Sequence, residues 1–124
     1  MTQQAPISET TSADFDLARA AEIAARNDAL RRDRLGGHVV MIAAVAALPP
    51  DTLTAAILAM RRFDNFTPEN DPYREHDFGA FEHAGERFFF KIDTYADHTL
   101  TEGAEDPLAS GVVRVLTLML ASDY

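Results

Sequence analysis

The spacing of apolar residues along the chain predicts two helices in its first half. An alanine-rich stretch beginning near Asp14 places Ile23 and Leu30 seven positions apart on one side, and the glycine pair 36–37 ends it. A second helix is expected to begin at Pro50 and end near Phe63, because apolar residues recur there every three or four positions.

A β-hairpin is the clearest local signal in the sequence. Residues 78–83 and 86–95 are rich in phenylalanine and flank Ala84-Gly85, which is typical of a two-residue turn between antiparallel strands. This pairing places Phe81 opposite Phe88. Alternate residues then form a core face and an outer face, with Phe81, Phe88, Phe90 and Ile92 on the first and Phe78, Phe89, Lys91, Asp93 and Tyr95 on the second.

The remaining apolar runs predict one more strand and one more helix. The run 38–46 is rich in β-branched residues and favours a buried strand, although periodicity alone also permits a helix. Asp106 and Pro107 suit the cap and first position of a C-terminal helix. The wide apolar face of that helix would carry Leu108, Val112, Val115, Leu116, Met119 and Leu120.

These elements predict an α+β fold with the order α-β-α-β-β-α. About three helices would cover a small antiparallel sheet made of the hairpin and one further strand. The polar residues 1–12 are expected to be a disordered tail and to lack the features of a signal peptide, so residues 13–124 would form one domain.

Composition narrows the class of protein further. A chain of 124 residues with 47% hydrophobic residues can form one core, and the absence of cysteine excludes disulfides and thiolate metal sites. The longest apolar run, residues 39–48, is about half the length of a membrane-spanning helix. We therefore expect a cytoplasmic protein that does not enter a membrane.

The net charge of −9 is concentrated in one part of the chain. Residues 64–106 contain twelve acidic and three basic residues, whereas the rest of the chain contains eight of each. A protein that binds a phosphate backbone carries the opposite charge, so direct binding to nucleic acid is not expected. Such a charge distribution favours a basic partner.

Several segments of the chain carry a resemblance to a known family: NDALRR at 27–32, GGHVVMIAAVAALPP at 36–50, FTPENDPYREHDFGAFEHAGERFFFKIDTY at 66–95 and VLTLMLASDY at 115–124. Together they resemble the domain of unknown function 3768 family, whose members are small proteins, mostly of alphaproteobacteria and often plasmid-borne. The resemblance implies a bacterial accessory protein of mobile elements and no particular catalytic residue. Thr94 departs from the pattern, since an aromatic residue is expected beside Tyr95.

The leading functional hypothesis is binding of a basic protein partner through the acidic hairpin and its loops. The loops at 64–76 and 96–105 should emerge at the same end of the hairpin, where carboxylates could imitate a phosphate repeat, as an anti-defence factor would. The residues proposed to contact the partner are Asp71, Glu75, Lys91, Asp93, Tyr95 and Asp97. This hypothesis requires no cofactor and no catalytic residue.

The alternative hypothesis is a small enzyme that uses a cluster of histidine and carboxylate residues. His76, Asp77 and Asp93 could perform acid–base chemistry, and with His98 they could bind a divalent metal. No standard ligand spacing supports the metal, and such residues also serve as ordinary loop and cap residues. A third hypothesis, an oligomerising module, predicts a large apolar patch on the outer face of the hairpin.

Overall fold

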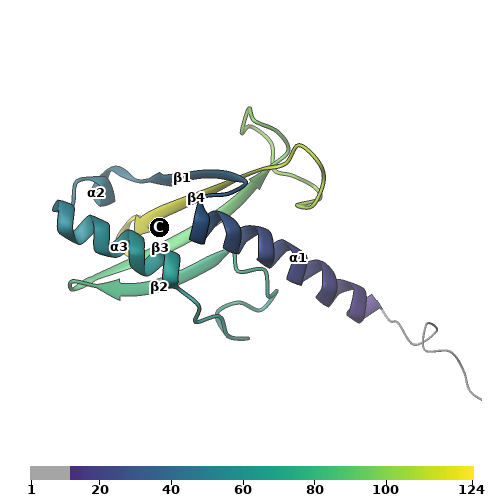
Figure 1. Cartoon of the computed structure of the whole chain (residues 1–124), viewed down its shortest axis with the longest axis horizontal. Coiled ribbons are helices and arrows are strands. Elements are labelled where there is room, and N and C mark those ends of the chain that lie inside the picture. The colour runs from purple at the N-terminus through teal and green to yellow at the C-terminus, as the bar shows by residue number, and fades with distance from the viewer. Residues whose placement is uncertain (1–11) are drawn as a thin grey trace, which may run out of the picture.

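A computed structural model describes residues 12–124 of the chain (Figure 1). The predicted disordered tail therefore lies outside the described residues, except for Ser12, which is the first residue of a helix. The elements in chain order are α1 (Ser12–Asp33), β1 (Gly37–Met41), α2 (Ala43–Ala46), α3 (Pro50–Arg62), β2 (Phe78–His83), β3 (Glu86–Tyr95), β4 (Val113–Leu120) and the 3-10 turn η2 (Ala121–Asp123).

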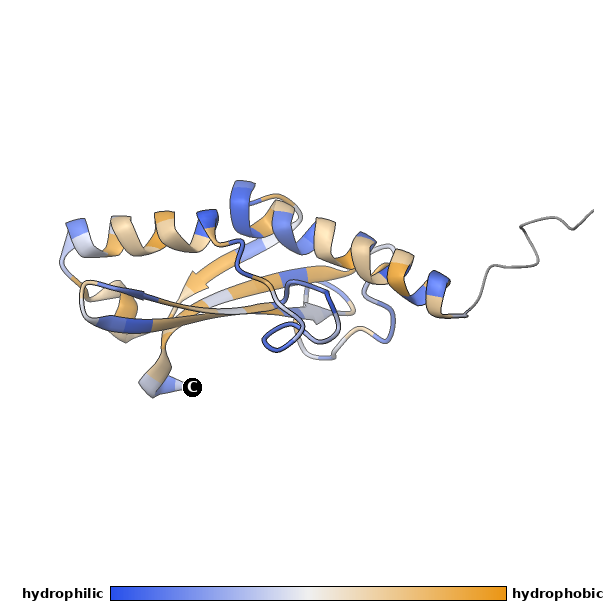
Figure 2. Ribbon diagram, turned by 90° about the horizontal axis from the view of Figure 1, so that it is seen from below, coloured by the Kyte–Doolittle hydropathy of each residue, from blue (hydrophilic) through white to orange (hydrophobic). Residues whose placement is uncertain are grey.

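The four strands form one mixed sheet in the order β1-β4-β3-β2. β1 runs parallel to β4, and the other neighbouring pairs are antiparallel. Figure 2 shows α1 and α3 on one side of the sheet and the C-terminus on the other. The predicted α+β class is thus confirmed, although the sheet has four strands and contains one parallel pair. No helix within residues 12–124 has the length and apolar character needed to cross a membrane.

The predicted hairpin is confirmed in its strands, its turn and its register. Phe81 pairs with Phe88, and Glu82 pairs with Arg87. The two turn residues Ala84 and Gly85 have φ angles of 53° and 80°. Positive φ at both central residues is the geometry of the type I′ turn, whose twist matches that of the flanking strands.

The predicted C-terminal helix is wrong, because residues 113–120 form strand β4. This strand lies between β1 and β3 and is covered on both faces, so apolar residues occur at consecutive positions and fit helical spacing equally well. Arg114, Leu116 and Leu118 face the helices, while Val115 and Met119 face the other side, and all five are buried. Pairing with β1 and β3, which no local pattern reveals, selects the strand.

The strand predicted at residues 38–46 is correct only in its first half. β1 ends at Met41, and Ile42 donates a last hydrogen bond from its backbone N–H to the Leu118 carbonyl. Residues 43–46 then form the short helix α2. Alanine is the strongest helix former, and three of these four residues are alanine.

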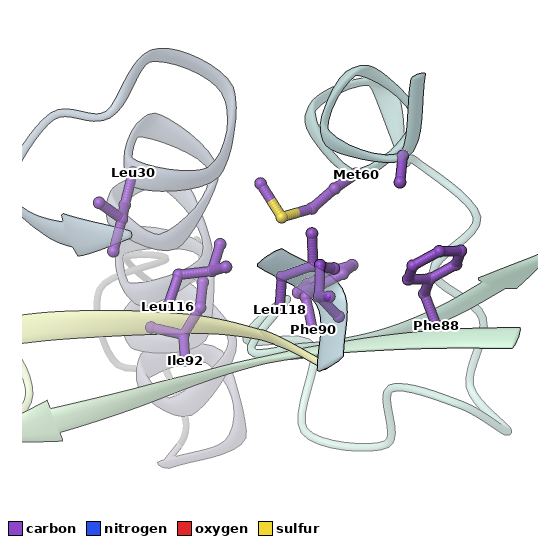
Figure 3. Packing of buried hydrophobic residues seen from close by; sticks show 9 residues of the cluster. Leu30, Met60, Phe88, Phe90, Ile92, Leu116 and Leu118 are labelled. Carbon is purple, nitrogen blue, oxygen red and sulfur yellow. The ribbon is translucent and has the colours of Figure 1, made fainter. Parts of the chain in front are cut away.

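The core lies between the sheet and the helices α1, α2 and α3 (Figure 3). The predicted core face of the hairpin is confirmed, because Phe88, Phe90 and Ile92 are buried and Phe81 packs against them. Gly79 of β2 lies directly against this core, since a Cβ atom there would come within 2.2 Å of the Phe90 ring. The buried cluster consists of Leu30, Val45, Ala56, Met60, Phe88, Phe90, Ile92, Leu116 and Leu118.

The opposite face of the sheet, here called the open face, is not covered by α1 or α3, and the C-terminal turn η2 lies on that side (Figure 2). Phe78 and Phe89 are partly buried there, with ring centroids 5.0 Å apart. The C-terminal Tyr124 packs its ring against both phenylalanines. The aromatic residues predicted for this face are therefore present, and the chain's own C-terminus contacts them.

Candidate functional site

The segment between α3 and β2 folds into a compact loop that turns Asp71 inward. Thr67 and Asn70 exchange two hydrogen bonds between backbone N–H groups and side-chain oxygens, and the Asn70 amide donates to the Asn65 carbonyl. The Asp71 carboxylate, only 5% exposed, then accepts the backbone N–H of His76 at 3.3 and 3.4 Å. The loop thus fixes the backbone from which His76 projects.

His76 lies between α1 and the loop. Its Nδ1 is 3.0 and 3.1 Å from the two carboxylate oxygens of Asp28, and its ring stacks on Phe66 with centroids 3.9 Å apart. Because the Asp28 carboxylate accepts, the imidazole donates through Nδ1–H, and a neutral imidazole keeps a lone pair on Nε2. Nε2 lies 3.7 Å from Asp71 Oδ2, beyond hydrogen-bond distance.

Asp28 is held in turn by a buried arginine. Arg31, fully buried, donates to Asp28 at 2.7 Å and to the carbonyl oxygens of Met60 and Arg61 at the end of α3. Burial lowers the pKa of Arg31, while its hydrogen bond to Asp28 opposes that effect. Removal of Asp28 would leave the buried guanidinium of Arg31 without its carboxylate, which is strongly destabilising. The Arg31–Asp28 pair therefore connects α1, α3 and His76 as one unit.

A second buried contact ties the same loop to β4. Asn27 donates from its amide to the Glu75 carbonyl at 2.9 Å and accepts a hydrogen bond from Arg114 Nε at 3.0 Å. Arg114 also donates to the Pro107 carbonyl at 2.7 Å, so the segment before β4 joins the network. Asn27, Asp28 and Arg31, which the sequence analysis did not select, thus hold the site in place.

The backbone of the loop adopts an unusual conformation beside the imidazole. Arg74 and His76 have φ angles of 59° and 57°, in the left-handed region that residues other than glycine seldom adopt. Such residues are retained when surrounding contacts compensate for the strain, and they cluster at functional sites. Here the Asp71 and Asp28 contacts on either side of His76 supply that compensation.

Two adjoining cavities share Arg74 and His76 as lining residues. One, of about 420 Å³, lies against α1 and is otherwise lined by Leu17, Ala21, Ala24, Ala25 and Asp28. The other, of about 280 Å³, lies against the loop and is otherwise lined by Phe66, Thr67, Pro68 and Asp71. The first volume falls within the range of small-molecule sites. We call the two cavities together the His76 cleft.

Within residues 12–124, no hydrogen bond or ion pair joins the His76 imidazole to the carboxylates of Asp77 or Asp93, its proposed catalytic partners. The side chain of Asp77 has a raised pKa, first because burial disfavours its charge and then because Asp71 and Asp93 repel it. Glu75 has a raised pKa for the same kind of reason: burial first, and then repulsion by Asp77. The acidic residues that form ion pairs with the imidazole in the described chain are Asp28 and Asp71, and of these two only Asp71 is among the predicted site residues.

The other predicted site residues lie apart from the His76 cleft. Lys91 and Asp93 form an ion pair of 3.1 Å on the open face, and Tyr95 makes a β-bridge with Gly103. Asp97 accepts hydrogen bonds from Thr99 in the connection 96–112, where His98 is exposed. Within residues 12–124, no three histidine or acidic side chains are grouped so as to hold a metal ion.

The fold and the site define a small α+β protein with a mixed four-stranded sheet, a buried ionic network and an acidic set of connections. Residues 41–123 match the family described as protein of unknown function, DUF3768. The chain belongs to this family, as its sequence segments predicted. No curated protein and no solved structure matches the chain.

Proposed function

We propose that the chain is a non-enzymatic accessory protein of bacterial mobile elements that acts in the cytoplasm by binding a basic protein partner. The observation that carries the proposal is the placement of charge. All of the excess negative charge lies in residues 64–106, and the two connections that contain most of it leave the hairpin at the same end. We call these two connections, residues 64–77 and 96–106, the acidic end.

Contacts between distant segments support a single acidic surface there. The backbone N–H of Ile92 donates to the Asp77 carbonyl, so the loop before β2 lies beside the end of β3. Arg19 of α1 pairs with Asp106 at 2.9 Å, which places the N-terminal half of α1 beside the connection 96–112 (Figure 1). This half of the helix adds three exposed acidic residues: Asp14, Asp16 and Glu22.

Electrostatic repulsion within the acidic end gives a reason for it to bind cations. The pKa values of Glu75 and Asp77 are raised by burial and then by neighbouring carboxylates, so their ionised forms are disfavoured in the free protein. Positive side chains of a partner would relieve this repulsion and would also steer the encounter between the two proteins. A protein groove that normally binds nucleic acid has the required charge.

Accessibility decides which predicted contacts can reach a partner. Asp71 is buried against His76, so it would act by holding the loop. Glu75, Asp93 and Asp97 retain exposed carboxylate surface and can contact a partner directly. Lys91 and Tyr95 lie beside Asp93 on the open face, where the Lys91–Asp93 pair would have to open to free its carboxylate.

The proposal is tested by capturing proteins from a bacterial host with the full chain and with two triple variants. Asp97→Lys, Glu102→Lys and Glu105→Lys together reverse exposed charges of the acidic end. The matched control reverses three exposed charges elsewhere: Asp51→Lys, Glu82→Lys and Glu86→Lys. We expect a salt-sensitive partner that the control retains and the first variant loses. Equal capture by both variants would refute the acidic end as the binding surface.

An acid–base enzyme is the second candidate, and the hydrogen bond between His76 and Asp28 favours it. A carboxylate that fixes one imidazole nitrogen leaves the other free to exchange a proton with a substrate. In this candidate His76 is the acid–base group and Asp28 a positioning residue, in place of Asp77 and Asp93. A reaction found with the chain and lost in His76→Gln would support it, whereas a reaction that survives this substitution would contradict it.

A further inference from the structure

His76 Nε2 and Asp71 Oδ2 lie close together in the His76 cleft, and both accept hydrogen bonds when the imidazole is neutral. With Nδ1–H donated to Asp28, a neutral His76 presents a lone pair on Nε2, and Asp71 Oδ2 lies 3.7 Å away. This separation is too long for a direct hydrogen bond. A group with several N–H donors placed beside the two atoms, about 2.8 Å from each, would bond to both, and an ammonium group has three such donors.

Arg74 supplies the opposite charge at the same place. Arg74 lines both cavities, and no carboxylate within residues 12–124 forms an ion pair with its guanidinium. The left-handed backbone at Arg74 fixes the point from which its side chain leaves the loop. An unpaired guanidinium binds a carboxylate well because its planar donors match the two oxygens.

The α1 side of the cleft is apolar. Leu17 and three alanines, Ala21, Ala24 and Ala25, line this side of the cavity, whose volume is about 420 Å³. A hydrophobic group of a ligand would fit against this wall while polar groups of the same ligand face His76, Asp71 and Arg74. Small-molecule sites commonly combine a largely apolar lining with a few convergent polar groups.

We propose that the His76 cleft binds a small zwitterion of the amino-acid class, with its ammonium group beside His76 Nε2 and Asp71, its carboxylate on Arg74 and its side chain against α1. A simple anion would satisfy Arg74 and leave the two acceptors unpaired in an acidic protein. A simple cation would satisfy the acceptors and meet the charge of Arg74. The proposal requires neither catalysis nor the binding of a basic partner, so its test is separate from theirs.

The test titrates the full-length protein with each of the common L-amino acids and follows backbone amide and histidine ring resonances by NMR. We expect at least one amino acid to bind with a Kd of about 1 mM or tighter, with shifts confined to the loop 66–76 and to residues 17–28 of α1. For the best ligand, the amine without its carboxylate and the acid without its ammonium group should each bind about tenfold more weakly or worse.

Arg74→Gln distinguishes the cleft from a non-specific effect of charge. The variant removes the guanidinium and should weaken binding of the zwitterion by about tenfold or more. Arg34→Gln is the matched control, because Arg34 is also exposed and has a φ of 59° but lies outside both cavities. Its affinity should equal that of the unmodified chain.

Three outcomes would overturn the proposal. They are the absence of any shift at His76 at about 10 mM of every amino acid, undiminished binding by Arg74→Gln, and binding of the half-molecules as tight as that of the zwitterion. An unchanged amide spectrum of each variant without ligand establishes that the fold is intact.

Discussion

Two ion pairs on opposite faces of the sheet show how burial changes what a charge does in this protein. On the helix-covered face, fully buried Arg31 donates to Asp28 at 2.7 Å, and Asp28 binds His76. On the open face, Lys91 and Asp93 are 3.1 Å apart with side chains 39% and 42% exposed. Water can replace either partner of the second pair, whereas in the first pair Arg31 is closed to water and Asp28 is only 17% exposed. The buried pair therefore determines geometry, and the exposed pair contributes mainly to surface charge.

The largest expected effect follows from breaking the buried pair. Arg31→Ala leaves Asp28 without its cation and removes the hydrogen bonds to the end of α3, so we expect a loss of about 3–5 kcal/mol in the free energy of unfolding. Urea unfolding followed by circular dichroism measures this loss. A loss below about 1 kcal/mol would mean that the network is more hydrated than its burial indicates.

Adjacent phenylalanines provide the next comparison, because Phe90 faces the helices and Phe89 faces the open side. Phe90 is fully buried, so Phe90→Ala should cost about 3–5 kcal/mol through lost burial and a cavity. Phe89→Ala removes a partly exposed ring and should cost about 1–2 kcal/mol. Equal losses in parallel urea titrations would show that something covers the open face as completely as the helices cover the other.

Burial raises the pKa of Asp77, and the carboxylates of Asp71 and Asp93 raise it further by repulsion. Its raised pKa means that ionisation destabilises the folded state, so its penalty is present above the folded-state pKa and is relieved as pH falls through that value. Asp77→Asn should therefore raise the free energy of unfolding at pH 7, by less than about 1 kcal/mol because solvent screens the group.

Unfolding curves collected from pH 7 down to about 4 check the sign of this effect. The advantage of Asp77→Asn should shrink as the pH falls. Asp97 and Asp106 have the opposite effect on the pH dependence of stability. Hydrogen bonds from Thr99 and Leu108 lower the pKa values of these two carboxyl groups, so their ionised forms stabilise the folded state. Their stabilising contribution is present above the unfolded-state pKa and is lost as pH falls through the folded-state value. An advantage of Asp77→Asn that grows toward low pH would contradict the assignment.

The smallest effect is expected for the exposed pair. Lys91→Ala should change the free energy of unfolding by less than about 1 kcal/mol, and the change should decrease further at high salt. Thermal unfolding at low and high ionic strength measures both. A loss comparable with that of Arg31→Ala would remove the contrast between the two faces.

The sequence predicts correctly those helices and strands whose signals lie within the element itself or its adjoining turn. The turn at Ala84-Gly85, the alternation of the flanking strands and the proline at the start of α3 predicted those elements correctly. Charge counting likewise located the acidic stretch between residues 64 and 106. His76 and Asp71 were selected as site residues because histidine and aspartate in a loop are chemically distinctive.

The partners of those residues could not be selected in the same way. Asn27, Asp28 and Arg31 lie on a helix rich in charged residues, where polar side chains usually face solvent. One signal was available: Asn27 and Arg31 lie one turn apart and share the helix side of Ile23 and Leu30, which is the buried side. A polar residue on the buried side of a helix is a reason to expect a buried partner.

Local sequence signals are enough to specify the hairpin, α1, α3 and the segregation of charge, because these depend on neighbouring residues. The strand formed by residues 113–120 between β1 and β3 depends on tertiary packing, because an apolar run covered on both faces satisfies either periodicity. Tertiary packing also brings His76 to Asp28, 48 residues away in sequence. Contacts of this kind arise when separate elements pack together, and no spacing within either segment encodes them.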